Sequence, residues 1–202
     1  MEDRQAVVNS PSEHLPVWDE VDARLLDHAS ALIAARGTGG LTIAELAREA
    51  GVSRPTIYRR WPGVDEVVRA ALLRQTVSIL RGFSPAIATR GDLVDEILRF
   101  ADAFAADPVF ARLLTREPAA FTQYSLERVG SSQRVMLRWL TGAIARGQRG
   151  GSVREGDADD MSVMLLLIVQ SAVLSHNAVS ALIGAVEWRA ELTRAVDGYL
   201  RP

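Results

Sequence analysis

The chain has no cysteine and no lysine among its 202 residues, so all 23 of its basic residues are arginine. Without cysteine, the protein cannot form disulfides, use a thiolate nucleophile or bind a metal through sulfur. The three histidines, His14, His28 and His176, are scattered and are not paired with a nucleophile. We therefore find no catalytic constellation and expect neither enzyme activity nor a cofactor.

Strong net charge and a leader-like segment are absent too. The net charge is −2, so any attraction to nucleic acid must be local. The first residues lack the basic start and apolar run of a signal peptide. The most apolar stretch, 161–174, includes Ser162 and Gln170 and is too short to span a bilayer. These features predict a cytoplasmic protein that contacts no membrane.

What the chain does contain favours helices throughout. Apolar residues recur at helical spacing, and no segment shows sustained two-residue alternation. The fold is therefore predicted to be all-α. The expected helices are 18–36, a pair within 41–61, 64–80, 93–104, 109–114, 121–146 with a kink or short break near Gly130, 157–182 and 187–200.

Segment 41–61, LTIAELAREAGVSRPTIYRRW, has the form of a helix-turn-helix. Thr42 and Glu45 have the spacing of a capping box, which satisfies free amides at a helix start. Leu41 and Leu46 flank that cap at the spacing of a hydrophobic staple. The segment therefore predicts a short helix, a tight turn and a second, basic helix.

The second helix is expected to contact DNA. Gly51 can end the first helix because a left-handed backbone costs glycine little, and Ser53 can cap the next one. Residues at the N-terminal end of such a helix enter the major groove, so Arg54 is placed to read bases. Tyr58 would instead contact phosphate or sugar. The predicted DNA-binding residues are Thr42, Ser53, Arg54, Pro55, Thr56, Tyr58, Arg59 and Arg60. An ordinary helical hairpin with a solvated arginine face is the alternative.

Residues 20–75 resemble the DNA-binding domain of TetR-family transcriptional repressors. The family pattern T-x-x-x-[IL]-A-x-x-A-G-V-S-x-x-x-[IL]-Y-x-x-[FW] is carried here by Thr42, Leu46, Ala47, Ala50, Gly51, Val52, Ser53, Ile57, Tyr58 and Trp61. The resemblance implies a homodimer whose body binds a small molecule and thereby shifts the fourth helix. The chain departs from the family at Val64, where a phosphate-contacting lysine is frequent.

The predicted organisation has three parts. Residues 1–17 form a mobile N-terminal arm, 18–63 a helix-turn-helix DNA-binding domain, and 64–202 a helical ligand-binding and dimerisation domain. The 161–174 helix is apolar on nearly all sides, so it must be covered all round. We expect it to join the last helix in a dimer interface, with burial inside one subunit as the alternative.

Aromatic residues concentrate between the helix-turn-helix segment and the predicted dimerisation helices. Ligand sites are typically apolar with a few polar anchors, so we expect such a site in the body, although core packing explains the same residues. The candidates are Phe100, Phe104, Phe121, Tyr124, Trp139 and Gln170. Asp157, Asp159 and Asp160 could suggest a metal site, but at a predicted helix start we expect them to cap amides. No metal site is predicted.

The sequence therefore predicts a ligand-responsive transcriptional regulator. We expect a repressor that is released from an inverted-repeat operator in double-stranded DNA by a small apolar molecule. The alternatives from other classes are a dimeric helical small-molecule carrier and a protein-binding adaptor that reuse the same fold.

Overall fold

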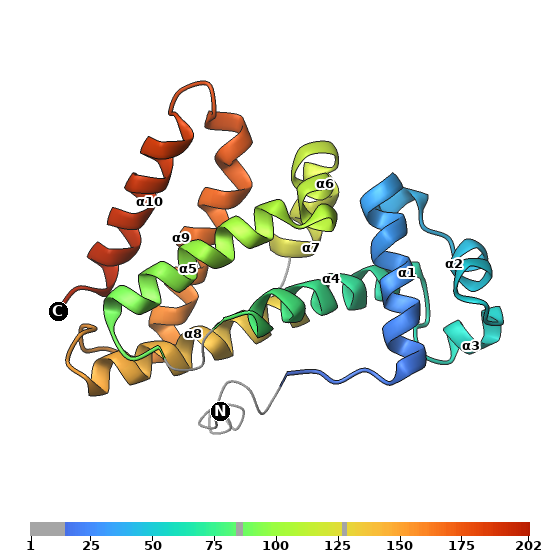
Figure 1. Cartoon of the computed structure of the whole chain (residues 1–202), viewed down its shortest axis with the longest axis horizontal. Helices are drawn as coiled ribbons and strands as arrows, with labels where there is room; N and C mark the ends of the chain where they lie inside the picture. The colour runs from blue at the N-terminus through green and yellow to red at the C-terminus, as the bar shows by residue number, and fades with distance from the viewer. Residues whose placement is uncertain (1–14, 84–86, 127–128) are drawn as a thin grey trace. The chain divides into compact units, whose positions relative to one another are not determined.

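The computed structural model describes residues 15–83, 87–126 and 129–202, and within them the chain is helical without a β-strand. This confirms the predicted all-α fold. Most of the predicted arm, residues 1–14, lies outside the described residues. The elements are α1 (Glu20–Arg36), η1 (a 3-10 turn, Thr38–Gly40), α2 (Ile43–Ala50), α3 (Arg54–Tyr58), α4 (Val64–Arg81), α5 (Arg90–Ala106), α6 (Pro108–Arg116), α7 (Pro118–Leu126), α8 (Ser131–Arg149), α9 (Ala158–Val179) and α10 (Ala185–Leu200) (Figure 1).

The contacts between residues divide the chain into two compact units. The head unit consists of Pro16–Leu80 and Phe104–Ser132, and the body unit contains Arg81–Ala103 and Gln133–Pro202. Helices α6 and α7 therefore group with the helix-turn-helix, although they follow α5 in sequence. The division into a DNA-binding domain, 18–63, and a ligand-binding and dimerisation domain, 64–202, stays a prediction.

The head unit is built around α1. Leu25, Leu26 and Ile33 of this helix are fully buried, because they recur on one helical face. Helix α2 packs against α1, and so does α6, which contributes the buried side chains of Phe110 and Leu113. The position of α1 thus depends on contacts from both segments of the head unit.

The body unit has its own apolar core. Leu93, Ile97, Leu140, Ile144 and Leu165 from α5, α8 and α9 are buried together with residues of α10. Helices α9 and α10 pack against one another and run in opposite directions (Figure 1). The core therefore joins all four helices of this unit.

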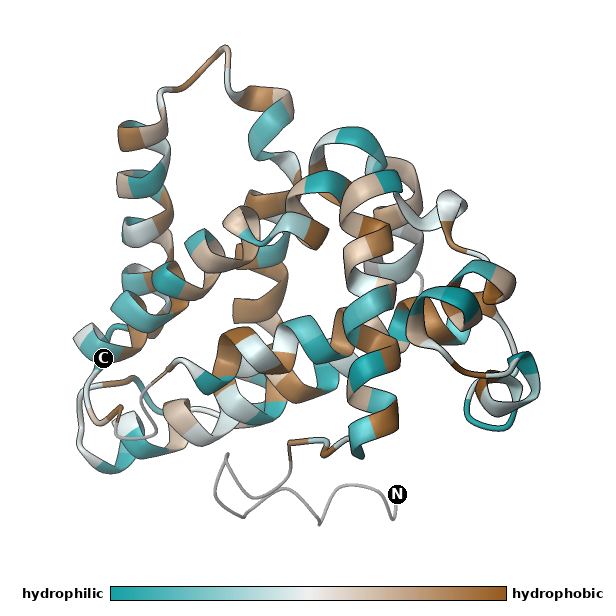
Figure 2. Cartoon of the chain, turned by 45° about the vertical axis from the view of Figure 1, so that its right-hand side comes forward, coloured by the Kyte–Doolittle hydropathy of each residue, from teal (hydrophilic) through white to brown (hydrophobic). Residues whose placement is uncertain are grey.

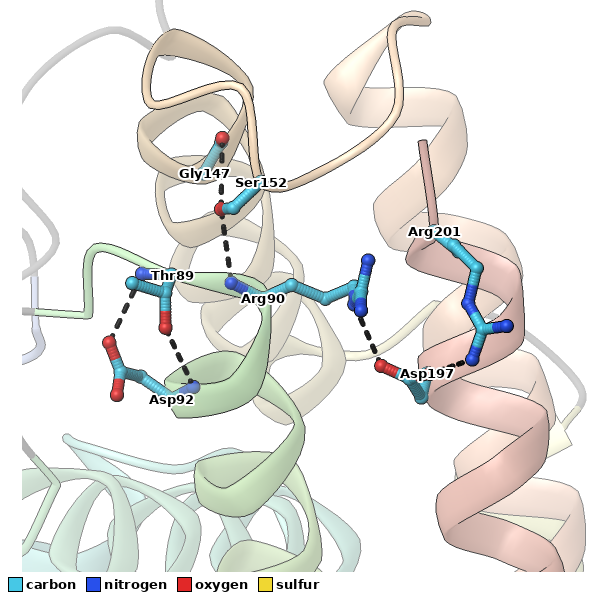
Figure 3. A network of polar contacts seen from close by, with 7 residues as sticks. All are labelled: Thr89, Arg90, Asp92, Gly147, Ser152, Asp197 and Arg201. Atoms are coloured by element: carbon cyan, nitrogen blue, oxygen red, sulfur yellow. Dashed lines mark hydrogen bonds and ion pairs between the residues drawn. The ribbon is translucent and has the colours of Figure 1, made fainter.

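A polar network closes one end of the body unit (Figure 3). The Arg90 Nε donates to Asp197 at 2.7 Å, and Arg201 donates to the other carboxylate oxygen at 2.7 Å. The Arg90 backbone N–H donates to Ser152 Oγ at 3.1 Å, which in turn donates to the Gly147 carbonyl at 3.2 Å. The hydrogen bonds from Arg201 and Arg90 lower the pKa of Asp197 below its ordinary value. The network thus ties the start of α5 to the end of α10.

The predicted helix 121–146 is two helices in the structure, α7 and α8. The predicted break near Gly130 is present, but α7 begins earlier, at Pro118, and α8 continues to Arg149. Proline is compatible with the first turn of a helix, which explains the early start. Residues 127 and 128 between these helices lie outside the described part of the chain.

The apolar stretch 161–174 was predicted to be too short to span a membrane, but the helix that contains it is long enough, so the length argument is wrong. Helix α9 extends that stretch at both ends to 22 residues, and an 18-residue window reaches a mean hydropathy of 1.6. Within its own chain α9 is poorly covered, since only Met161, Ser162 and Leu165 are buried. Most of its middle turns are coloured hydrophobic in Figure 2. Val163, Met164 and Leu167 of α9 are therefore exposed in the single chain.

Candidate nucleic-acid interface

Helix α2 begins at a side-chain cap, as the sequence predicted. The Glu45 backbone N–H donates to Thr42 Oγ1 at 3.2 Å, which satisfies one amide of the first turn. The second half of the predicted capping box is replaced, because the Glu45 carboxylate pairs with Arg36 and Arg48. Leu46 is fully buried beneath this turn. The cap and the burial together fix where α2 starts.

The turn between α2 and α3 depends on Gly51. This residue has φ +65°, in the left-handed region where a side chain is strained. The Val52 backbone N–H donates to the Ala47 carbonyl at 3.0 Å, which closes the end of α2. Ser53 Oγ then accepts the Thr56 backbone N–H at 3.3 Å and starts α3. The turn therefore sets the direction of α3.

Helix α3 presents a charged and aromatic outer face. Ile57 is fully buried and anchors the helix, whereas Arg54, Tyr58 and Arg59 are exposed. Neither Arg54 nor Arg59 forms an ion pair with a carboxylate in the described residues. Regular helix ends at Tyr58, earlier than the predicted segment, and a turn carries the chain to Trp61. Two arginines and a phenol are thus available on one short surface.

Arg60 differs from the other candidates because it holds α3 against α1. Its guanidinium pairs with Asp22, and its Nη2 lies 3.2 Å from an oxygen of Asp19. The hydrogen bond from Arg60 to Asp22 raises the pKa of the guanidinium. Asp19 also caps α1, accepting the Asp22 backbone N–H at 2.7 Å, and this hydrogen bond lowers the pKa of Asp19. Arg60 is therefore committed to contacts within the head unit.

A fixed, basic second helix behind a capped first helix is the architecture of helix-turn-helix DNA-binding proteins. Residues 25–71 match the profile of the family described as bacterial regulatory proteins, tetR family. HTH-type transcriptional regulators from Mycobacterium bovis and Mycobacterium tuberculosis, both described as uncharacterized, are 36% identical over 181 residues. The alignment covers 90% of this chain and 95% of each relative. The chain belongs to the TetR family of transcriptional regulators and carries its DNA-binding helix-turn-helix.

Solved structures of low identity share the fold. FadR from Bacillus subtilis, solved with stearoyl-CoA, has a TM-score of 0.62 at 18% identity, covering 89% of this chain and 99% of its own. SmeT, the repressor of a Stenotrophomonas maltophilia multidrug efflux pump, has a TM-score of 0.60 at 17% identity, covering 90% of each chain. A regulator from Saccharomonospora viridis, in complex with choline, has a TM-score of 0.59 at 20% identity, covering 91% and 98%. At these identities the likeness concerns the fold.

Of the predicted ligand residues in the head unit, Phe104 and Phe121 belong to one aromatic group, whereas Tyr124 has a different partner. Phe104 and Phe121 lie 6.1 Å apart between ring centroids, and both contact the buried ring of Phe110. Tyr124 instead donates to Asp65 Oδ1 at 3.4 Å, and its partial burial raises the pKa of the phenol. Phe110 shows that ordinary core packing accounts for much of this group.

The remaining candidates belong to the body unit. Phe83 lies between Phe100, at 6.0 Å, and Trp139, at 6.4 Å, measured between ring centroids. Gln133 Nε2 donates to Gln170 Oε1 at 3.0 Å, so the polar anchor expected from α9 has a protein partner. These contacts group Phe100 with Trp139 but do not add Gln170 to them.

Of the three acidic residues at the start of α9, Asp157 caps the helix as predicted, whereas the Asp159 carboxylate accepts the Thr141 hydroxyl at 2.9 Å. Asp157 Oδ1 accepts the backbone N–H groups of Asp159 at 2.9 Å and Asp160 at 3.0 Å. Within the described residues no group of three histidine, aspartate or glutamate side chains could hold a metal ion.

Sequence reasoning missed Glu96 and Glu117, two largely buried carboxylates. Glu96 could have been found, because it lies three residues after Leu93 and four before Phe100 and thus shares their helical face. Glu117 contacts Thr38, which is 79 residues away, and no local pattern announces that contact.

Proposed function

We propose that this regulator is a homodimeric repressor that leaves an inverted-repeat operator when a small apolar molecule binds its body. The observation that carries the proposal is the exposed surface of α3 and its C-terminal end, which presents Arg54, Tyr58 and Arg59. A guanidinium can donate two hydrogen bonds to guanine in the major groove, so Arg54 is assigned base reading, with Thr56 beside it.

The other head residues are assigned to the DNA backbone. Tyr58 and Arg59 follow the base-reading end of α3 and would bind phosphate or sugar. Thr42 stands at the start of α2, where free amides attract an anion, and Ser53 and Pro55 surround the start of α3. Arg60 would contribute by holding α3 in place and only secondarily by its charge.

Dimerisation is the proposed reason for the uncovered apolar surface of α9. Val163, Met164 and Leu167 on this helix are between 44% and 48% exposed, which is unusual for large apolar side chains in a continuous stripe. A second copy of α9 and α10 would cover them. We therefore propose a cytoplasmic dimer rather than a membrane-bound chain.

An effector that enters the body is supported by the fold and by its relatives. FadR was solved with stearoyl-CoA and the Saccharomonospora viridis regulator with choline, so proteins of this fold bind small molecules. In this chain Phe100 and Trp139, joined by Phe83, offer an apolar surface in the body unit. The effector would weaken DNA binding only if it prefers an arrangement of the heads that DNA does not.

Selection of duplexes from a random library by the purified full-length protein tests the operator. We expect the selected sequences to contain two symmetric half-sites, and the Arg54→Ala/Arg59→Ala variant to select none. Light scattering should give twice the 22.0 kDa of one chain. Selected duplexes with a single half-site, or a monomer at micromolar concentration, would contradict the proposal.

A further inference from the structure

A buried carboxylate lies in the body unit on the same face of α5 as its apolar core residues. Glu96 is only 7% exposed, and the neighbouring Leu93 and Ile97 are buried. Taking a carboxylate out of water is costly unless a positive charge accompanies it. Arg99 supplies such a charge in the structure, because its Nη1 donates to Glu96 Oε1 at 3.0 Å.

Arg99 also lies against an aromatic ring. Its Cζ is 5.0 Å from the ring centroid of Phe83, a cation–π distance. Phe83 in turn contacts the rings of Phe100 and Trp139. The guanidinium is thus held by a carboxylate and an aromatic face together. We call Glu96, Phe83, Phe100 and Trp139 the cation cluster; all four belong to the body unit.

The two partners in this ion pair differ in their exposure to solvent. The Arg99 side chain is 58% exposed, whereas that of Glu96 is 9% exposed. The pair also has the i,i+3 spacing of a helix surface pair, which contributes little stability when one partner is in water. The Arg99 side chain can therefore move into solvent when another cation takes its place, whereas the Glu96 carboxylate stays buried.

We infer that the cation cluster is a binding subsite for an organic cation, and that Arg99 fills it in the free protein. The inference rests on the proposed effector binding and narrows the effector to an apolar molecule with one positive charge, such as a substituted ammonium. Its charged group takes the place of the Arg99 guanidinium beside Glu96 and Phe83. A neutral molecule of the same shape gains nothing from the carboxylate, and an anion is repelled by it.

Two probes of equal shape separate charge from apolar contact. Benzyltrimethylammonium and neopentylbenzene differ only in that a nitrogen cation replaces a quaternary carbon. Their dissociation constants for the full-length protein are measured by calorimetry, and the ratio of the two constants reports the preference for charge. Because shape and apolar area cancel in this ratio, differences between variants reflect the groups that contact the charge.

The expected shifts have opposite signs. Arg99→Gln removes the internal competitor and should move the ratio about tenfold toward the cation. Glu96→Gln removes the carboxylate and should move it about tenfold away from the cation. The control pair is Glu191 and Arg194 of α10, which has the same spacing but both partners exposed; Glu191→Gln and Arg194→Gln should leave the ratio unchanged. Thermal unfolding verifies that each variant is folded.

The result that would overturn the subsite is a ratio that moves in the same direction in Arg99→Gln and Glu96→Gln, or in neither. Failure of both probes to bind would overturn it as well. Operator affinity is measured in the same samples, so the two proposals fail separately. Charge-selective binding that leaves operator affinity unchanged supports the subsite and contradicts the effector response. Loss of operator affinity with no preference for charge supports the effector response and overturns the subsite.

Discussion

Replacing Glu117 with alanine should destabilise the head unit from a position far from the helix-turn-helix in sequence. The Glu117 carboxylate accepts the backbone N–H of Thr38 at 2.9 Å and the Thr38 hydroxyl at 2.7 Å. Arg112 Nε lies 3.8 Å from its other oxygen. Thr38 begins the η1 turn that leads from α1 to α2. Glu117→Ala therefore removes the acceptor that holds this turn to the end of α6.

The size of the effect follows from the number and the burial of these bonds. A hydrogen bond to a charged group contributes about 1.5–3 kcal/mol, and water can partly replace the lost acceptor because the Glu117 side chain is 21% exposed. We expect Glu117→Ala to lower the free energy of unfolding by about 2 kcal/mol. Glu117→Gln keeps an oxygen but not the charge, and Thr38→Val loses only one bond, so each should cost about 1 kcal/mol.

Gly37 supplies an independent test of the same geometry. It has φ +86°, a region that favours glycine, and a Cβ added there would overlap Oε1 of Glu117. Gly37→Ala in the wild-type chain therefore introduces both backbone strain and a steric clash. In the Glu117→Ala chain only the strain remains, about 1–3 kcal/mol. The double variant should thus lose less stability than the sum of the two single variants.

Urea unfolding followed by circular dichroism gives these free energies, with all variants at one protein concentration because dimers are stabilised by mass action. Glu191→Ala, at an exposed pair in α10, serves as the control and should change the stability by less than about 0.5 kcal/mol. The reasoning is refuted if Gly37→Ala and Glu117→Ala are additive, since additivity means that the two residues do not touch.

The remaining predictions concern DNA, assembly and pH. Arg54→Ala should reduce discrimination between operator and scrambled duplex by about 1–3 kcal/mol in titrations at fixed salt, whereas Arg59→Ala should weaken binding to both duplexes alike; equal losses in Arg54→Ala would disprove base reading. Leu167→Glu places a charge on the exposed stripe of α9 and should yield monomers by light scattering, and an intact dimer would locate the interface elsewhere. Asp197→Asn should cost less than about 1 kcal/mol at pH 7. Because the pKa of Asp197 is lowered by folding, its contribution is complete above the ordinary value of 3.8 and is lost as the pH falls through the lowered pKa, so wild type and variant should converge in acid. A gap in unfolding free energy that stays constant down to pH 2 would refute the role of the Arg90 ion pair.

Local chemistry made the helix-turn-helix predictable. Thr42, Gly51 and Ser53 act on neighbours within five residues, so their spacing alone indicates the cap, the turn and the second cap. The all-α fold was predictable for the same reason, since helical periodicity is a local property. The exposure of Arg54 and Arg59 is a local consequence too, because the apolar Ile57 between them faces the core.

Contacts between distant segments were not predictable from one sequence. Arg60 looked like a further basic residue of the DNA surface, but Asp19 and Asp22, about forty residues earlier, take up its charge. Helix α6 packs against α1 because the shapes of their apolar faces fit. The sequence indicates only that each face is apolar, and not which faces fit each other. For Gln170 the sequence suggested a ligand or a hydrogen bond between subunits as the polar partner, because its partner within the chain, Gln133, is 37 residues away.

The head unit is not one continuous piece of chain, and this limits how such regulators can be recombined. A fragment that ends after α4 would leave out α6, and with it the acceptor for Thr38 and the apolar cover of α1. Exchanging DNA specificity between two regulators of this design therefore requires two inserts, Pro16–Leu80 and Phe104–Ser132, taken from the same donor. A single-insert chimaera would join a foreign α1 to a resident α6, and the pair would have to fit by chance.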